Sequence, residues 1–237
     1  MMLSLKHRNS MNERIEQVAE SLVAVSDNSP RSEQELPGNL QDGYRYFLSR
    51  CDGGYTKDHF WHFFGQSGPN LHNLVEWNSN DLWKKYYGLD EKTFVFAEDI
   101  FGTQFCFDVR GNRRVVKMLL PDGGKISLSA NTFEEFLELE VLGQAHNLHV
   151  RRLAHMFFQS SSQAFRLFSH ISCKIPATLG GNDSDLGNLE LMRSSTHLKI
   201  LGQIASQIKN LPSGTRIRDV RIDEAREEIT LLPDSGK

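Results

Sequence analysis

The sequence contains few cysteines and no long apolar run. Its three cysteines, Cys51, Cys106 and Cys173, are odd in number and far apart, which excludes a disulfide framework and a CxxC metal site. We therefore expect reduced, partly buried thiols, as in cytoplasmic proteins. No apolar stretch is long enough to cross a bilayer, so no transmembrane helix is expected. The N-terminal segment lacks an uninterrupted apolar core and a small-residue cleavage site, and we expect no secretory signal and a cytoplasmic location.

A large excess of charge of one sign is also missing. The chain has 27 Lys and Arg against 30 Asp and Glu, a formal net charge of −3, which predicts no global attraction to nucleic acid or to an anionic membrane. Its 237 residues are 39% hydrophobic and 24% charged. This length and composition suit one large domain or two small ones with a sizeable core.

Helical spacing of apolar residues appears twice near the N-terminus. It predicts one helix over 12–25 and a second over 40–50. Turn formers separate the two, and the sequence DGG ends the second because Gly53 and Gly54 tolerate left-handed geometry. The aromatic run HFWHFFG (59–65) predicts a buried strand or turn. Asn80 is a possible cap for a short helix that Gly88 would end.

A β-hairpin is predicted by FAEDIFGTQFCFDVRG (96–111), in which apolar residues alternate on both sides of Gly102. Its strands would cover 93–99 and 103–109. A third strand is expected over 113–120, and the turn sequence PDGG leads from it to a fourth over 125–128.

The rest of the chain predicts helices and two further strands. Thr132 and Glu135 have the spacing of a capping box for a helix with Phe133 on its apolar face. The stretch 177–188 is typical of a flexible loop or linker. An amphipathic helix around 198–211 follows, and then two strands, which are expected over 216–222 and 228–232.

Acidic catalysis is the first functional alternative. Glu98 and Asp99 are adjacent, so alternation on a strand would place them on opposite faces, although Asp108 could approach one of them across the hairpin. A catalytic pair would need burial to raise a pKa. We expect carboxylates that face solvent or a partner, and no catalytic residue.

Metal, nucleophile and phosphate sites lack their usual patterns. His59 and His62, and likewise His146 and His149 with His155, have spacings that a metal site could use. However, HExxH, GxSxG, GxGxxG and GxxxxGK[ST] are all absent. We therefore expect no metal and no cofactor.

Residues 141–182 contain no Asp or Glu. This could be a basic patch for RNA or DNA, but four cations are few for such a surface. The preferred interpretation is that its apolar residues pack on the sheet: Leu153, Met156, Phe157, Phe158, Phe165, Leu167 and Phe168.

The middle of the chain resembles the SUKH superfamily, which includes a fungal cell-wall-assembly regulator and many bacterial immunity proteins. The residues that carry the resemblance occur in family order over about 34–142: Glu35-Leu36-Pro37, Tyr44 with Phe47-Leu48, Asp52-Gly53-Gly54, VFAEDIFGTQFCFD (95–108) with Gly102, and Thr132-Phe133-Glu134-Glu135-Phe136-Leu137.

This resemblance implies an α+β fold, in which helices pack on an antiparallel, strongly bent sheet, here with a C-terminal helix-strand-strand extension. We predict an N-terminal helical extension (1–32), a SUKH-like domain (33–145) and a C-terminal extension (146–237) that packs on the domain or forms a small subdomain.

It also implies a non-enzymatic protein-binding role, of which toxin neutralisation by an immunity protein is the preferred form. The partner would be a protein, such as a cationic nuclease toxin, that meets an acidic surface containing Glu76, Asp81, Glu98 and Asp99. A regulatory scaffold is the second reading, and a nucleic-acid-binding protein is a further alternative.

Overall fold

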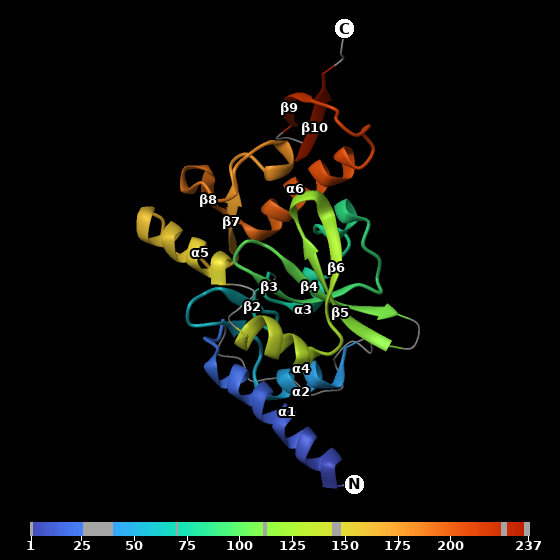
Figure 1. Ribbon diagram of the computed structural model, residues 1–237, viewed down its shortest axis with the longest axis vertical. Coiled ribbons are helices and arrows are strands. Elements are labelled where there is room, and N and C mark those ends of the chain that lie inside the picture. Colours follow the sequence, from blue (N-terminus) through green and yellow to red (C-terminus); the bar gives the residue numbers. More distant parts are fainter. Residues whose placement is uncertain are drawn as a thin grey trace.

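A six-stranded antiparallel sheet lies at the centre of the computed structural model (Figure 1), which describes residues 2–25, 40–69, 71–110, 113–143, 148–223 and 227–234. The strands pair in chain order: β1 (Gly54–Tyr55), β2 (Trp61–Phe63), β3 (Phe94–Asp99), β4 (Gln104–Arg110), β5 (Arg113–Leu120) and β6 (Lys125–Ala130). Register shifts between Val95 and Ala97 and between Val116 and Lys117 mark irregularities in the ladder, and such bulges bend a sheet. The α+β class expected from the sequence is confirmed.

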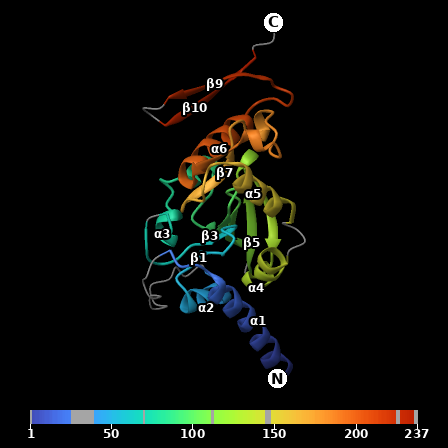
Figure 2. The ribbon, with the colours of Figure 1, turned by 90° about the vertical axis from the view of Figure 1, so that its left-hand side faces the viewer.

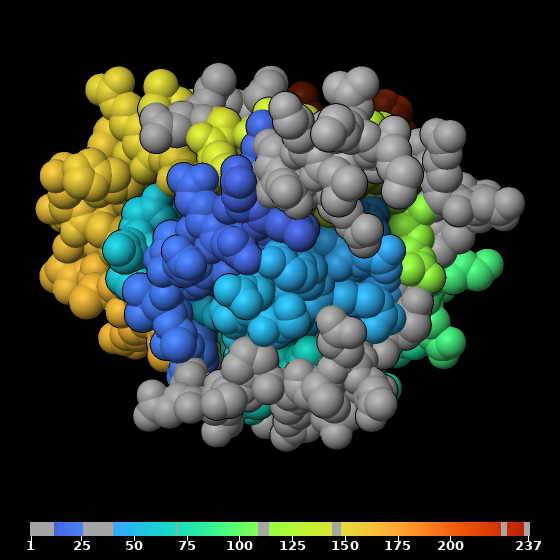
Figure 3. All heavy atoms as spheres, turned by 90° about the horizontal axis from the view of Figure 1, so that it is seen from below, coloured from blue at the N-terminus to red at the C-terminus, as the bar shows by residue number. Residues whose placement is uncertain are grey.

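Helices α1 (Met2–Ser21), α2 (Asp42–Arg50) and α4 (Phe133–Phe136) pack against one another, and α4 continues into a π-helical turn, η4 (Leu137–Leu142). Figure 3 shows α1 and α2 side by side on the lower face of the molecule. Their buried side chains meet the sheet in an aromatic core made by Tyr44, Phe47, Phe63, Phe96, Phe107, Phe133 and Phe136. None of the described helices is long and apolar enough to cross a membrane.

The connection between β2 and β3 contains two short helical segments, α3 (Leu74–Trp77) and η2 (Lys84–Tyr87). Asn73 caps α3, because its side chain accepts hydrogen bonds from the amides of Val75 and Glu76. Asn80 does not cap η2, which begins four residues later at Lys84, so that prediction was wrong. The predicted end at Gly88 is confirmed, since Gly88 is left-handed with φ of 65°.

The C-terminal part adds two hairpins and two helices: α5 (Leu148–Ser160), β7 (Ser169–Cys173), β8 (Leu189–Arg193), α6 (Ser194–Ile208), β9 (Ile217–Asp223) and β10 (Glu228–Pro233). The predicted α6, β9 and β10 are confirmed, whereas β7 and β8 were not predicted. Residues 177–188 join two paired strands through η5 (Ala177–Leu179) and η6 (Leu186–Asn188), so they form a hairpin loop and not a linker between domains. Figure 2 shows the β9–β10 ribbon above α6, at the far end from α1.

Helix α6 approaches the sheet part closely at Gly202. A Cβ atom there would lie 2.7 Å from Cβ of Tyr86 and 2.8 Å from Cε2 of Tyr87, both on η2. On the neighbouring turn, η3 (Asp122–Gly124), the added Cβ of Gly124 would contact Ala205 at 3.4 Å. Small residues therefore set the distance at which the C-terminal part packs.

The glycines expected from the family pattern are required by backbone geometry. Gly53 has φ of 68°, and a Cβ there would lie 2.4 Å from the carbonyl oxygen of Phe63. Gly102 has φ of 87°, and its Cβ would lie 2.7 Å from Nδ1 of His170. Gly54, at φ of 135°, opens β1. Pro37 and the predicted break after the first helix lie outside the described residues.

Candidate functional site

Only two of the four residues of the predicted acidic surface are exposed. Glu76 and Asp81 are exposed on the connection between β2 and β3. Glu98 and Asp99 on β3 are 2% and 8% exposed, so they cannot belong to a surface that meets a partner. The expectation failed because β3 is buried on both faces: the helices cover one face, and the C-terminal hairpin β7–β8 contributes His170 beside the other.

Asp99 organises the turn of the β3–β4 hairpin. Its Oδ1 accepts hydrogen bonds from the amides of Phe101 and Thr103, each at 2.9 Å. Burial raises its pKa to about 6, although these hydrogen bonds act in the opposite direction. Asp108 does not approach Asp99, because it forms an ion pair with Lys117 on the neighbouring strand.

Glu98 lies at the centre of a buried polar network. Its nearest strand neighbours are His62 on β2 and Gln104 on β4, which the antiparallel register places on the same face. Oε1 lies 3.0 Å from Nδ1 of His62, and Oε2 accepts a hydrogen bond of 2.8 Å from the Gln104 amide. The indole of Trp77 donates in turn to Gln104 at 2.9 Å.

The network continues from His62 to His72. Nε2 of His72 donates to the backbone carbonyl of Asp52 at 2.8 Å, so its Nδ1 must accept from Nε2 of His62, 2.9 Å away. The contacts from Asp52 to His72, from His72 to His62 and from His62 to Glu98 would need three hydrogens. Two neutral imidazoles and an ionised carboxylate carry only two. The three contacts therefore cannot all be hydrogen bonds while both rings are neutral and Glu98 is ionised.

The pKa shifts follow from burial and from these contacts. Burial raises the pKa of Glu98, but His170 and His62 outweigh it and hold the pKa at about 2. Burial lowers the pKa of His72 to about 4, with a smaller contribution from His62. The pKa of His62 is lowered by burial and raised by Glu98, and burial is the larger effect.

On its other side Glu98 meets the C-terminal part. Oε2 lies 3.2 Å from Nε2 of His170 on β7, and Nδ1 of His170 lies 3.1 Å from Nδ1 of His197 on α6. Both histidines are at most 3% exposed. Burial holds the pKa of His197 well below its usual range, which favours a neutral imidazole at neutral pH. The network thus joins the sheet to β7 and α6 through titratable side chains.

Among the described residues, the histidines whose spacing could suit a metal site are not brought together. His62 is buried in the network, whereas His59 stacks on Phe165 with 4.0 Å between ring centroids. His146 lies outside the described residues, and His149 and His155 are exposed on α5. Within the described part of the chain, no group of three or more His, Cys, Asp or Glu side chains is arranged to hold a metal ion.

The segment without acidic residues packs largely as expected. Phe157 is buried, and four other predicted residues pack partly buried on the core: Leu153, Phe158, Phe165 and Phe168. Met156 and Leu167 were predicted to be buried but are exposed. Arg151 pairs with Asp58 and Lys174 donates to a backbone carbonyl, so two of the four cations already have intramolecular partners.

Two larger hollows involve the C-terminal part, one where it meets the sheet part and one within it. A cavity of about 560 Å³, which we call the junction cavity, is bordered by the β3–β4 turn, α5, β7 and α6, and His197 belongs to its wall. A groove of about 570 Å³ lies between α6, the β7–β8 hairpin and the β9–β10 ribbon, with Ile222 exposed on its rim.

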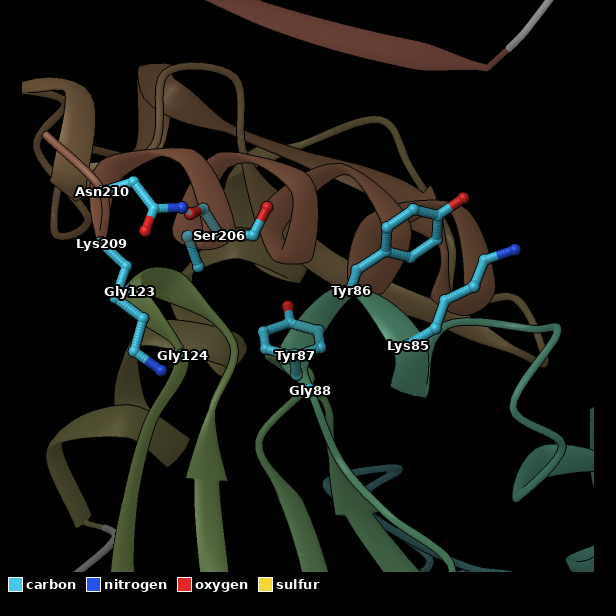
Figure 4. A pocket seen from close by; sticks show the side chains of 10 residues that line it. Lys85, Tyr86, Tyr87, Gly88, Gly123, Gly124, Ser206, Lys209 and Asn210 are labelled. Atoms are coloured by element: carbon cyan, nitrogen blue, oxygen red, sulfur yellow. Dashed lines mark hydrogen bonds between the residues drawn. The ribbon is translucent and has the colours of Figure 1, made fainter.

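A smaller hollow of about 270 Å³ separates η2, η3 and the end of α6 (Figure 4). It contains Lys85 and Lys209 and no acidic residue. Figure 4 shows the two lysine side chains on opposite sides of Tyr87, and their ammonium groups do not converge. The end of α6 that borders this hollow also carries the negative pole of the helix dipole. This hollow therefore lacks the geometry of an anion site.

Comparison with known proteins finds a family model that matches the middle of the chain. Residues 31–139 match the SMI1 / KNR4 family (SUKH-1). The SUKH resemblance expected over about 34–142 is thereby confirmed. The matched region contains all six strands of the sheet, α2 and α4.

A solved structure has the same fold over most of the chain. The crystal structure of Atu4351 from Agrobacterium tumefaciens superposes with a TM-score of 0.50 and 9% sequence identity, covering 91% of this chain and 96% of that one. At this identity the likeness is one of fold, and it extends beyond the SUKH-1 region. No curated protein matches the chain in sequence.

Sequence reasoning missed His72, His170 and His197. Of these, His170 lies on β7, beside Glu98 on β3. His72 contacts His62 on β2, the strand that pairs with β3. One signal in the sequence could have indicated His170. Residues 141–182 contain no acidic residue, so if this segment covers an acid of the sheet, its own polar side chains must pair with that acid.

Proposed function

We propose that this chain is a non-enzymatic protein-binding module that acts in the cytoplasm, and that its partner is a toxin which it neutralises. The SUKH-1 match over residues 31–139 carries this proposal, because this family supports a general role in protein interaction and its bacterial members include many immunity proteins. The fold alone does not fix the partner, so the remaining support must come from the surface.

The titratable groups support a binding role over catalysis. Glu98, His62 and His197 are each at most 3% exposed, and the cavity beside Glu98 measures about 10 Å³, which is room for about one water molecule. A substrate cannot reach the carboxylate there. Burial raises the pKa of Cys51 and of Cys106 to about 12, so neither thiol is an activated nucleophile.

The exposed acids on the β2–β3 connection are the surface that would meet a cationic toxin. Glu76 and Asp81 remain from the predicted set, and the exposed Asp90 and Glu91 follow on the same connection. Val75, which is 62% exposed, lies beside Glu76. Carboxylates around an exposed apolar side chain suit a partner whose active site binds phosphates, because charge complementarity speeds association and excludes other partners.

The test uses the toxins encoded beside this gene, each expressed alone and with this chain. We expect one of them to bind the chain and to be neutralised, measured as restored growth and as co-purification. The double variant Glu76→Lys/Asp81→Lys should weaken binding and protection, whereas Glu13→Lys/Glu20→Lys on the exposed side of α1 should leave both unchanged. Absence of binding and protection for every neighbouring toxin would contradict the proposal.

A regulatory scaffold is the second candidate, and the groove beside the β9–β10 ribbon favours it. Ile222 and Ile175 line this groove and are 67% and 55% exposed, and exposed apolar side chains that gather at one groove mark a candidate interaction site. The variant Ile222→Asp separates the two functions. A scaffold should lose one partner on this change, whereas an immunity protein should keep its protection.

A further inference from the structure

The junction cavity has the size and lining of a ligand site. Its volume of about 560 Å³ lies in the range of protein binding pockets, which are mostly apolar with a few polar groups. Apolar side chains from several parts of the fold contribute to its wall, among them Phe101, Leu120, Val150, Leu153, Ile171 and Leu201.

The charges around this cavity have one sign. Asp122 and Asp183 are the acidic residues of its lining, and the lining contains no Lys or Arg. Asp122 accepts hydrogen bonds from the amide and hydroxyl of Thr178, and Asp183 accepts one of 3.2 Å from the hydroxyl of Ser184. Neither carboxylate has a cation in these contacts, so the cavity favours an occupant that carries positive charge.

His197 supplies a buried polar anchor in the wall. Its side chain is only 3% exposed, and its Nδ1 lies 3.1 Å from Nδ1 of His170. Within the described residues no hydrogen bond engages its Nε2, and this atom is not among the fully enclosed unpaired ones. This nitrogen has no protein partner among the described residues, so it is available to hydrogen-bond a polar group of an occupant.

We propose that the junction cavity binds a segment of the partner protein that places an Arg or Lys side chain beside an apolar side chain. The apolar side chain enters between Leu153 and Ile171, and the cation lies against Asp122 and Asp183. This inference rests on the proposed protein-binding function, and it assigns the partner a second contact apart from the acids of the β2–β3 connection.

Three blocked dipeptides test the proposal: acetyl-Phe-Arg-amide, its near-isosteric neutral analogue acetyl-Phe-citrulline-amide, and the acidic acetyl-Phe-Glu-amide. Each is titrated into the full chain while the methyl NMR signals of Leu153 and Ile171 are followed. We expect saturable shifts with the Arg peptide, binding about three- to fivefold weaker with the citrulline peptide, and no saturation with the Glu peptide. Equal affinities for the three, shifts confined to Ile217 and Ile222 of the neighbouring groove, or no saturation with any peptide would overturn it.

Asp183→Asn provides the variant and Asp185→Asn its matched control. Both residues are exposed, and only Asp183 lines the cavity. The first change should reduce the preference for Arg over citrulline, because Asp122 remains, and the second should preserve it; a preference that Asp183→Asn leaves unchanged would overturn the assignment of the cation. Saturable peptide binding without any toxin neutralisation would refute the proposed function and support the cavity. Neutralisation that is insensitive to Asp183→Asn, combined with no peptide binding, would support the proposed function and refute the role of the cavity.

Discussion

Nε2 of His170 lies 3.2 Å from Oε2 of Glu98, and both side chains are 2–3% exposed. Glu98 belongs to the SUKH-1 region and His170 to the C-terminal part. The C-terminal part is therefore not a passive addition, because it helps to enclose a carboxylate of the central sheet. Four predictions follow from this junction and its surroundings.

Replacing Glu98 by Gln should lower the free energy of unfolding at pH 7 by about 3 kcal/mol, because it removes the charge that pairs with buried histidines. Chemical denaturation measures the effect. Glu76→Gln changes an exposed carboxylate and should stay within about 0.5 kcal/mol of the wild type. Similar values for the two variants would show that the Glu98 network does not stabilise the fold.

The stability of the protein should fall in mild acid because of His72. Its pKa is about 4 in the folded protein, against a reference value of 6.5, so the unfolded chain binds the proton more readily. The stabilisation is complete above pH 6.5 and is lost as the pH falls from 6.5 to 4, by up to about 3 kcal/mol.

His72→Gln keeps a donor for the Asp52 carbonyl and should flatten this part of the pH profile of unfolding. Asp99 acts in the opposite direction, since its pKa is raised to about 6 from 3.8 and its ionisation destabilises the folded state as the pH rises through that window. The difference between wild type and variant isolates His72. His155→Gln on the exposed side of α5 should retain the wild-type slope, and an unchanged slope in His72→Gln would contradict the assignment.

Replacing Gly202 by Ala should destabilise the protein by about 1–3 kcal/mol through overpacking, because the new Cβ meets Tyr86 and Tyr87 within 2.8 Å. The direction is informative, since Ala is favoured over Gly in an exposed helix by about 1 kcal/mol. Thr196→Ala on the exposed side of α6 serves as the control and should be nearly neutral. A stabilised Gly202→Ala variant would mean that α6 does not pack this closely on η2.

The three thiols should react with a disulfide reagent at different rates at pH 8. Cys106 is buried and Cys51 is partly buried, and burial raises the pKa of each to about 12. Burial also raises the pKa of Cys173, but this side chain is less enclosed and borders the junction cavity. Cys173 should therefore be modified first and Cys106 only on unfolding, and Cys173→Ser should remove the fast phase.

The sequence was sufficient to predict β3 to β6 and helices α2, α4 and α6, because these elements carry their own periodicity, whereas β1, α3 and α5 were not predicted. The run Phe94–Asp99 alternates, and Gly102 is the left-handed turn residue between β3 and β4. The alternation also suggested that one side of β3 faces water, and this was wrong. Burial on both faces depends on a hairpin far along the chain, which local patterns do not encode.

The candidate site was less predictable for the same reason. Glu76 and Asp81 are exposed as expected, since a turn-rich connection favours solvent. His170 and His197 come next to Glu98 only through tertiary packing, and their spacing in the sequence matches no motif. The division into domains at about residues 33 and 145 remains a prediction.

The strand order of the sheet has a consequence for the order of folding. Each of the six strands pairs only with its neighbours in the sequence, so the sheet can assemble by short loop closures while the chain is still being synthesised. Until β7 and α6 arrive, Glu98 lacks His170 and meets water on that side. We therefore expect folding to end when β7 and α6 pack on the sheet and enclose a carboxylate that was hydrated until then.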